Sequence, residues 1–287
     1  MTVPPAAFLM RRTARRALRT SPTNVLGAGA VKEIMRTITA AFVVLALAMP
    51  AHAAPSVFDE TEHVSRTIQM EPGGTLRLKN FSGRVTITAS DRPEVVIDAV
   101  RRATRSRLDR ITLDIHTSGS NVVVVDANQR DRSWWHVTGG NNVVETDFDI
   151  KVPRRTHLDL SVFSSPVSVD GVEGSHTVHG FSSRLVLTDV SGSVRAHTFS
   201  GSVTIREKSW EPNQTIDVDT FSGNVELRVP DSARGTVTFK SFSGRLDSDM
   251  PLTLHTSSRR NLEAELGGGG NGTFRFKTFS GSVKIGR

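Results

Sequence analysis

The sequence predicts an all-β fold, specifically a single-stranded β-helix (β-solenoid) with coils of about 18–22 residues. The first observation is a heptapeptide, Phe-Ser-Gly-x-Val-x-Ile, that recurs along the chain. The second is its spacing: from Phe163 onward the motif phenylalanines follow at intervals of 18, 18, 22, 21 and 37 residues. The third is that no segment after residue 54 has helical periodicity. An antiparallel β-sandwich of hairpins shows strands at similar intervals and is the alternative.

Each copy of the motif is expected to form a corner between two strands. Apolar residues fall five and three positions before the phenylalanine and four and six positions after it, so the alternation slips at the motif. A corner explains the slip if the glycine takes a positive φ. The phenylalanine would fill the inside of the bend and stack on its counterpart in the next coil. The predicted corner residues are Phe81, Gly83, Phe163, Phe181, Phe199, Gly201, Phe221, Gly223, Phe242, Gly244, Phe279 and Gly281.

The N-terminal region predicts an export signal. Met35-Arg36 begins a short basic segment, the apolar run 38–49 follows it, and Ala51-His52-Ala53 matches a cleavage site, so residues 35–53 form a signal peptide. Residues 1–34 indicate a translation start assigned too early or an extended basic segment. Residues 54–287 are expected to form a single β-solenoid domain whose repeats are clearest over 158–287. The protein is therefore expected to be exported, to the periplasm or the extracellular space.

Most of the net charge of +7 belongs to residues 1–53, which are not expected in the mature protein. Residues 1–53 hold seven of the 36 Lys and Arg residues and one of the 29 acidic residues, which leaves 29 basic and 28 acidic residues in 54–287. Such a balance offers no general basic surface for nucleic acid. No apolar run in the mature chain is long enough to span a membrane. Without cysteine, stability must come from packing.

A loop at 127–142 interrupts the strand pattern and is the first candidate binding site. It contains Trp134 and Trp135 next to Arg132 and His136. Adjacent tryptophans in a polar loop suit stacking on sugar rings or seating on a partner protein, and the cations suit an anionic glycan or lipid headgroup. The alternative is that the tryptophans fold back to cover the solenoid.

A column of polar residues is the second candidate. His179, His197 and Asp219 each lie two residues before a motif phenylalanine, so a solenoid would align them on its outer surface. Imidazole and carboxylate are usual ligands of divalent metals. The alternative is a solvated ladder that continues as Lys240 and Lys277.

The sequence predicts no catalytic residue and no cofactor. The motif serine recurs once per coil, whereas a nucleophile is one activated residue beside a base. Aspartate pairs at strand spacing suit a polysaccharide lyase or hydrolase on a β-helix, but also an ordinary soluble surface. These pairs are Asp147/Asp149, Asp217/Asp219 and Asp247/Asp249.

The motif array, the Ile/Leu-x-Val-Pro strand ends and the glycine-rich stretch before the closing Gly-x-Val-x-Ile resemble the bacterial DUF4097 family, over roughly Glu60 to Ile285. The resemblance implies a right-handed β-helix without catalytic residues, and an adhesin label that rests on analogy of shape. The chain departs from the family by placing Phe before Ser-Gly, where a small apolar residue is usual, and by its tryptophan loop.

Together these features favour an exported, non-enzymatic, adhesin-like β-solenoid that binds or scaffolds at the cell envelope. Its expected partner is an envelope protein or glycan. The alternative is a carbohydrate-active enzyme on a β-helix, and a third hypothesis is a subunit that assembles end to end through open strands.

Overall fold

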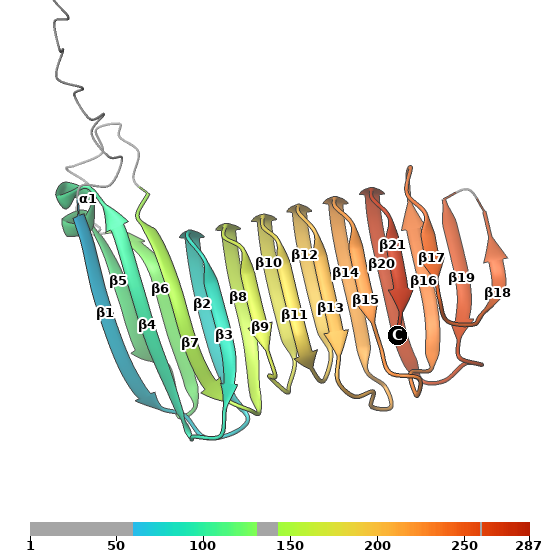
Figure 1. Cartoon of the computed structure of the whole chain (residues 1–287), viewed down its shortest axis with the longest axis horizontal. Helices are drawn as coiled ribbons and strands as arrows, with labels where there is room; N and C mark the ends of the chain where they lie inside the picture. Colours follow the sequence, from blue (N-terminus) through green and yellow to red (C-terminus); the bar gives the residue numbers. More distant parts are fainter. Residues whose placement is uncertain (1–59, 131–142, 259) are drawn as a thin grey trace, which may run out of the picture. The chain divides into compact units, whose positions relative to one another are not determined.

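The computed structural model describes residues 60–130, 143–258 and 260–287, whose strands form two large sheets (Figure 1). The ten-stranded sheet has the order β1 (Glu60–Gln69), β4 (Glu94–Ala103), β7 (Glu145–Pro153), β3 (Val85–Ser90), β9 (Val167–Asp170), β11 (Leu185–Val190), β13 (Val203–Glu207), β15 (Val225–Arg228), β21 (Val283–Gly286), β17 (Leu246–Ser248). The eleven-stranded sheet has the order β18 (Leu252–Ser257), β19 (Asn261–Leu266), β16 (Gly235–Ser241), β20 (Gly272–Ser280), β14 (Thr215–Ser222), β12 (Val194–Ser200), β10 (His176–Ser182), β8 (Thr156–Ser164), β2 (Gly74–Ser82), β6 (Val122–Arg130), β5 (Ile111–Thr117). One short helix, α1 (Arg105–Arg110), joins β4 to β5 within the described ranges. The predicted all-β fold is confirmed.

The central strand pairs are parallel and follow the sequence repeat. His176 of β10 lies opposite Leu158 of β8 on one side and opposite Val194 of β12 on the other, so one repeat of 18 residues advances the chain by one strand. Antiparallel pairs flank this parallel region at both ends: β1–β4, β4–β7 and β5–β6 at one end, β16–β19 and β18–β19 at the other. The antiparallel sandwich therefore does not describe the central pairs.

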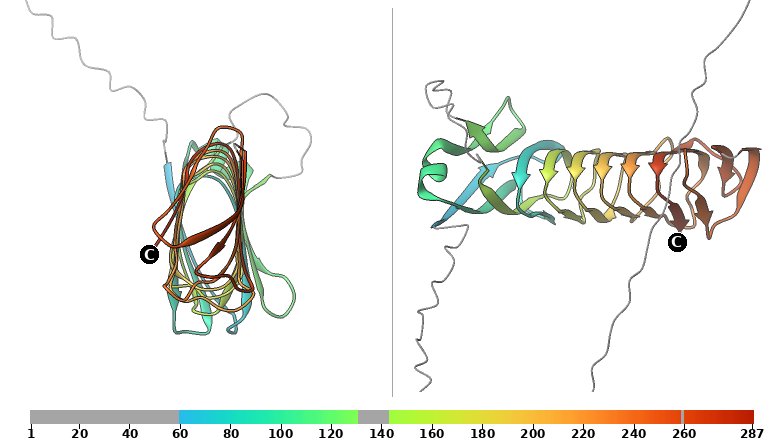
Figure 2. Two further views of the ribbon diagram at one scale, coloured as in Figure 1. Left: turned by 90° about the vertical axis from the view of Figure 1, so that its right-hand side faces the viewer. Right: turned by 90° about the horizontal axis from the view of Figure 1, so that it is seen from above.

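Each motif joins a strand of the eleven-stranded sheet to a strand of the ten-stranded sheet. The joined pairs are β2/β3, β8/β9, β10/β11, β12/β13, β14/β15, β16/β17 and β20/β21. Seen along the stack, the two sheets face each other across a narrow interior (Figure 2, left). The apolar positions predicted to point inward are all buried there: Val203, Ile205, Ile216, Val218, Val225, Leu227, Val237, Phe239, Phe274, Phe276, Val283 and Ile285.

The position of the motif phenylalanines was predicted wrongly. They do not fill the inside of the bend; each is 39–52% exposed on the outer surface. The physical reason is the strand alternation. In β14, Ile216, Val218 and Thr220 are buried, so Phe221 is the next outward position, and the phase slips only after it.

The last repeat does not lie at the end of the stack. β20 lies between β14 and β16, and β21 lies between β15 and β17. The hairpin of β18 and β19 packs on the far side of β16. The chain therefore passes the position of its final repeat and turns back. β20 and β21 lie between strands that precede them in the sequence.

Several predictions concern residues outside the described ranges. They are the signal peptide at 35–53, the segment 1–34, and the loop residues Arg132, Trp134, Trp135 and His136. In the part of the chain that the structure describes, no helix is long and apolar enough to cross a membrane.

Candidate functional site

Seven exposed phenylalanines form one continuous row that crosses the eleven-stranded sheet near the C-terminal ends of its strands. In spatial order they are Phe81, Phe163, Phe181, Phe199, Phe221, Phe279 and Phe242, hereafter the phenylalanine row. Neighbouring ring centroids lie 4.6–5.0 Å apart with interplanar angles of 1–8°. The motif places one ring on each strand, and the strand spacing of about 4.8 Å brings the rings to stacking distance. The predicted stacking between repeats is therefore present, but on the outside.

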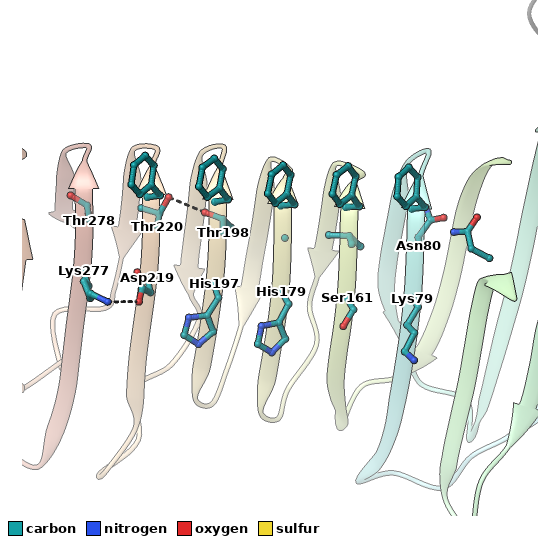
Figure 3. A pocket seen from close by; sticks show the side chains of 18 of the residues that line it. Lys79, Asn80, Ser161, His179, His197, Thr198, Asp219, Thr220, Lys277 and Thr278 are labelled. Carbon is teal, nitrogen blue, oxygen red and sulfur yellow. Dashed lines mark hydrogen bonds and ion pairs between the residues drawn. The ribbon is translucent and has the colours of Figure 1, made fainter. Parts of the chain in front are cut away.

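A second row runs parallel to the first, two residues earlier on each strand (Figure 3). This polar row consists of Lys79, Ser161, His179, His197, Asp219 and Lys277. The rings of His179 and His197 stack with centroids 5.3 Å apart. Lys277 Nζ lies 3.2 Å from Asp219 Oδ2 and forms an ion pair with it.

The two rows enclose an open groove of about 920 Å³. The residues between them on each strand form its floor: Asn80, Val162, Gly180, Thr198, Thr220 and Thr278. Polar side chains of the floor form hydrogen bonds within the protein. The hydroxyl of Thr198 donates to that of Thr220 at 2.9 Å, and the amide of Asn80 donates to the carbonyl oxygen of Thr146. Asp126 and Asn128 of β6 close the end next to Lys79. The groove is thus apolar along one side and polar along the other.

His179, His197 and Asp219 lie opposite one another on β10, β12 and β14. The predicted alignment of these three residues is therefore present. Lys277 and Lys240 continue it, as the solvated-ladder interpretation expects. Within the described ranges, however, no group of three or more His, Cys, Asp or Glu side chains is arranged to hold a metal ion. Asp219 instead neutralises Lys277.

Four of the six aspartates in the acidic pairs form ion pairs with cations on other segments of the chain. Asp217 binds Arg275, Asp219 binds Lys277, and Asp249 binds Lys284. Asp147 is a clearer case: partial burial would raise its pKa, but hydrogen bonds from the backbone N–H of Arg84 and from the Arg102 guanidinium hold the pKa below its usual range. These carboxylates act as cross-strand charge partners.

Two buried titratable groups lie elsewhere. Burial lowers the pKa of His176 to about 4 and raises the pKa of Glu207 to about 8. His176 contacts the carbonyl oxygen of Val172 through Nε2, and Glu207 Oε2 accepts a hydrogen bond from Gln214. Neither residue lines the groove. Both belong to the interior, so their shifted pKa values concern stability.

The phenylalanine row as a surface was missed from the sequence. The signal was available, because the phenylalanine has the same strand parity as the polar position two residues before it. The size and apolarity of the ring favour an interior position, whereas its strand parity places it on the outer surface.

Parallel strands in a regular repeat, crossed by a groove that is apolar along one side and polar along the other, define the chain as a β-repeat protein. Residues 164–286 match the family described as Toastrack DUF4097, which agrees with the resemblance that the sequence motifs indicate. No curated protein matches the chain.

The solved structures that resemble the chain are distant from it in sequence. One, from Clostridium sporogenes and provisionally named a cell adhesion protein, is 11% identical, covers 78% of this chain and 99% of its own, and has a TM-score of 0.48. A provisionally named adhesin from Bacteroides fragilis is 10% identical, covers 78% and 97%, and has a TM-score of 0.37. At such values these similarities carry no conclusion about function.

Proposed function

We propose that the protein is an exported, non-enzymatic binding protein of the cell envelope, adhesin-like, and that the groove along the phenylalanine row is its binding face. In this proposal the two sheets are two sides of a single-stranded β-solenoid, each repeat forming one coil. The in-register parallel pairs between successive repeats support that architecture. Residues 35–53 direct export, and residues 54–287 form the mature domain.

The exposed row is the observation that carries the proposal. Each ring–ring contact stabilises the stack by about 0.5–1.5 kcal/mol beyond simple burial. Stacking between repeats nevertheless leaves 39–52% of every phenylalanine facing water. Contiguous apolar surface of this kind marks interaction sites in soluble proteins. A partner that covers the row would bury this exposed apolar surface, which favours binding.

The enzyme alternative has little support in the geometry. A hydrolase needs a pair of carboxylates facing a substrate cleft. The two carboxylates at the groove, Asp126 on β6 and Asp219 on β14, have four strands between them, and Asp219 is paired with Lys277; the buried Glu207 lies outside the groove. An assay of uronate polymers is expected to show no turnover; product formation that depends on Asp219 would contradict the proposal.

Co-sedimentation with isolated cell-envelope material tests the binding face. The double variant Phe181→Ser/Phe199→Ser is expected to lose at least tenfold in bound fraction while remaining folded by circular dichroism. Leu254→Ser is the matched control, because Leu254 is 56% exposed on β18 and lies outside the groove. Equal binding of both variants and the parent protein would refute the groove as the binding face.

The tryptophan loop enters the proposal as a second contact. Trp134 and Trp135 together are expected to contribute to envelope binding, and Trp134→Ala/Trp135→Ala tests this in the same assay. A lowered melting temperature with unchanged binding would instead assign the loop a structural role.

A further inference from the structure

The part of each ring that a ligand can reach limits the chemistry of that ligand. Within the row the two faces of a ring are occupied by its neighbours, at 4.6–5.0 Å between centroids. At one end of the row the guanidinium of Arg260 lies 4.5 Å from the Phe242 centroid. The groove therefore presents C–H edges of rings. Sugars and cations bind aromatic side chains over the ring face, whereas aliphatic chains need only close contact with apolar atoms.

The opposite side of the groove is rich in hydrogen-bond donors. Lys79, Ser161, His179 and His197 occupy four consecutive strands of the polar row. Two carboxylates flank this stretch. Asp126 lies opposite Lys79 on β6, and its Oδ1 accepts the backbone N–H of Asn128; Asp219 pairs with Lys277 at the other end. Within the described ranges no carboxylate forms an ion pair with Lys79. The Lys79 ammonium only donates, whereas serine and histidine side chains can donate or accept, so the Lys79 end suits a ligand group that accepts hydrogen bonds.

The groove is long and straight. It runs from Phe81 to Phe279 across six strands of the eleven-stranded sheet, and five strand spacings of about 4.8 Å give a length of about 24 Å. An alkyl chain with staggered torsions is also straight and advances roughly 1.25 Å per carbon, so about twenty carbons match this length.

Building on the function proposed above, we propose that the groove binds one long-chain fatty carboxylate. Its alkyl chain lies along the edges of the phenylalanine row, and its carboxylate accepts hydrogen bonds at the Lys79 end. A second copy of the chain fits the groove less well. A two-fold axis between His179 and His197 would bring Lys79 of one copy against Lys277 of the other, which is already paired with Asp219, so the contact gains no complementary charge.

Equilibrium dialysis of the full chain against fatty acids below their micelle concentrations tests the inference. Affinity is expected to rise about twofold to fourfold per methylene, from laurate through palmitate to stearate, and to level off near twenty carbons. Affinity that is independent of chain length, or absence of palmitate binding, would overturn the inference.

Side-chain variants test the two halves of the ligand separately. Lys79→Gln is expected to weaken palmitate binding about fivefold to tenfold and binding of 1-monopalmitoylglycerol less than twofold. Lys240→Gln is the matched control, since it removes the same charge from the same column outside the groove. Phe181→Leu/Phe199→Leu is expected to retain binding within about threefold, and Phe181→Ser/Phe199→Ser to lose at least tenfold. Equal losses in the Leu and Ser variants would mean that the aromatic rings, not apolar contact, select the ligand.

Two further outcomes separate this inference from the proposed function. If palmitate does not bind but envelope binding still depends on Phe181 and Phe199, the fatty-acid inference fails and the binding face stands. Binding to phosphatidylglycerol vesicles without binding to monomeric palmitate would also overturn the inference, in favour of docking on a membrane surface. If neither palmitate nor envelope material binds, both proposals fail.

Discussion

The glycine of the motif is required because neighbouring repeats approach one another most closely there. A Cβ atom on Gly201 would overlap the carbonyl oxygen of Ser183 in the preceding repeat, and one on Gly223 would overlap that of Gly201. Gly201 also has a φ of 134°, whereas Gly223 has no left-handed φ. The predicted positive φ is therefore only part of the explanation, and close backbone contact is what the positions share.

Substituting Gly201 by alanine separates these two causes when a second glycine is used for comparison. Gly201→Ala is expected to lower the free energy of unfolding by about 2–4 kcal/mol, because strain and overlap act together. Gly73 has a φ of 87° but nothing within 4 Å of the added Cβ. Gly73→Ala is therefore expected to cost about 1–2 kcal/mol. Urea denaturation measures both, and equal costs would show that backbone strain alone explains the motif glycine.

Glu207 makes stability depend on pH. Its pKa is raised from 4.5 to about 8 by burial, so the folded protein holds this proton more tightly than the unfolded chain does. Its contribution is greatest below pH 4.5, decreases as the pH rises from 4.5 to about 8, and is constant above that. The change is on the order of a few kcal/mol.

Replacing this carboxyl by an amide removes the titration. Glu207→Gln is expected to leave stability near pH 5 almost unchanged and to raise it at pH 8.5 relative to the parent protein, because Gln keeps an oxygen for the hydrogen bond from Gln214. Denaturation curves at several pH values measure the difference in free energy of unfolding between the two proteins. The opposing titration of His176 cancels in this difference because both proteins contain His176. A constant difference across this range would contradict the burial of a protonated Glu207.

At the scale of single elements, the phenylalanine row and the interior contribute differently to stability. Phe181 stacks on two neighbours but is 45% exposed, whereas Leu187, on the next strand along the chain, is completely buried. Phe181→Ala is expected to cost about 1–3 kcal/mol from two lost ring contacts. Leu187→Ala is expected to cost about 2–5 kcal/mol. Chemical denaturation compares them; a larger loss for Phe181 would make the row chiefly a structural element.

The strand pattern of individual repeats could be read from the sequence because it depends on local alternation. Ile216, Val218, Val225 and Leu227 are buried as their parity predicts. The groove could not be read in the same way, since it requires knowing that Phe221 and Asp219 share the outer face and that the next strand repeats this arrangement in register. The position of Phe279 beside Phe221 was also beyond sequence reasoning, because chain order does not determine spatial order here.

At the scale of the whole molecule, the inserted last repeat makes the C-terminal end of the stack cooperative. In most repeat arrays a terminal repeat contacts only one neighbour and can be removed without unfolding the rest. Here β20 pairs with both β14 and β16, and its side chains Phe274 and Phe276 are completely buried in the hydrophobic core. The antiparallel hairpin of β18 and β19 pairs with β16. In both sheets the final repeat therefore lies between the central strands and β16, β17, β18 and β19.

Truncation after Gly270 tests this connection, because it removes β20 and β21 and leaves β16 without its parallel partner. The truncated protein is expected to lose cooperative unfolding of the C-terminal region and to expose the apolar residues of β16, which raises aggregation. Deletion of His176–Ser193 is the matched control of similar length. It removes one central repeat and brings Val194 to the register that His176 holds against Leu158, so it is expected to give a shorter protein that still unfolds cooperatively with a smaller denaturant dependence. Thermal unfolding followed by circular dichroism compares the two variants. A truncated protein that unfolds as cooperatively as the internal deletion would show that the last repeat behaves as an ordinary terminal unit despite its central position.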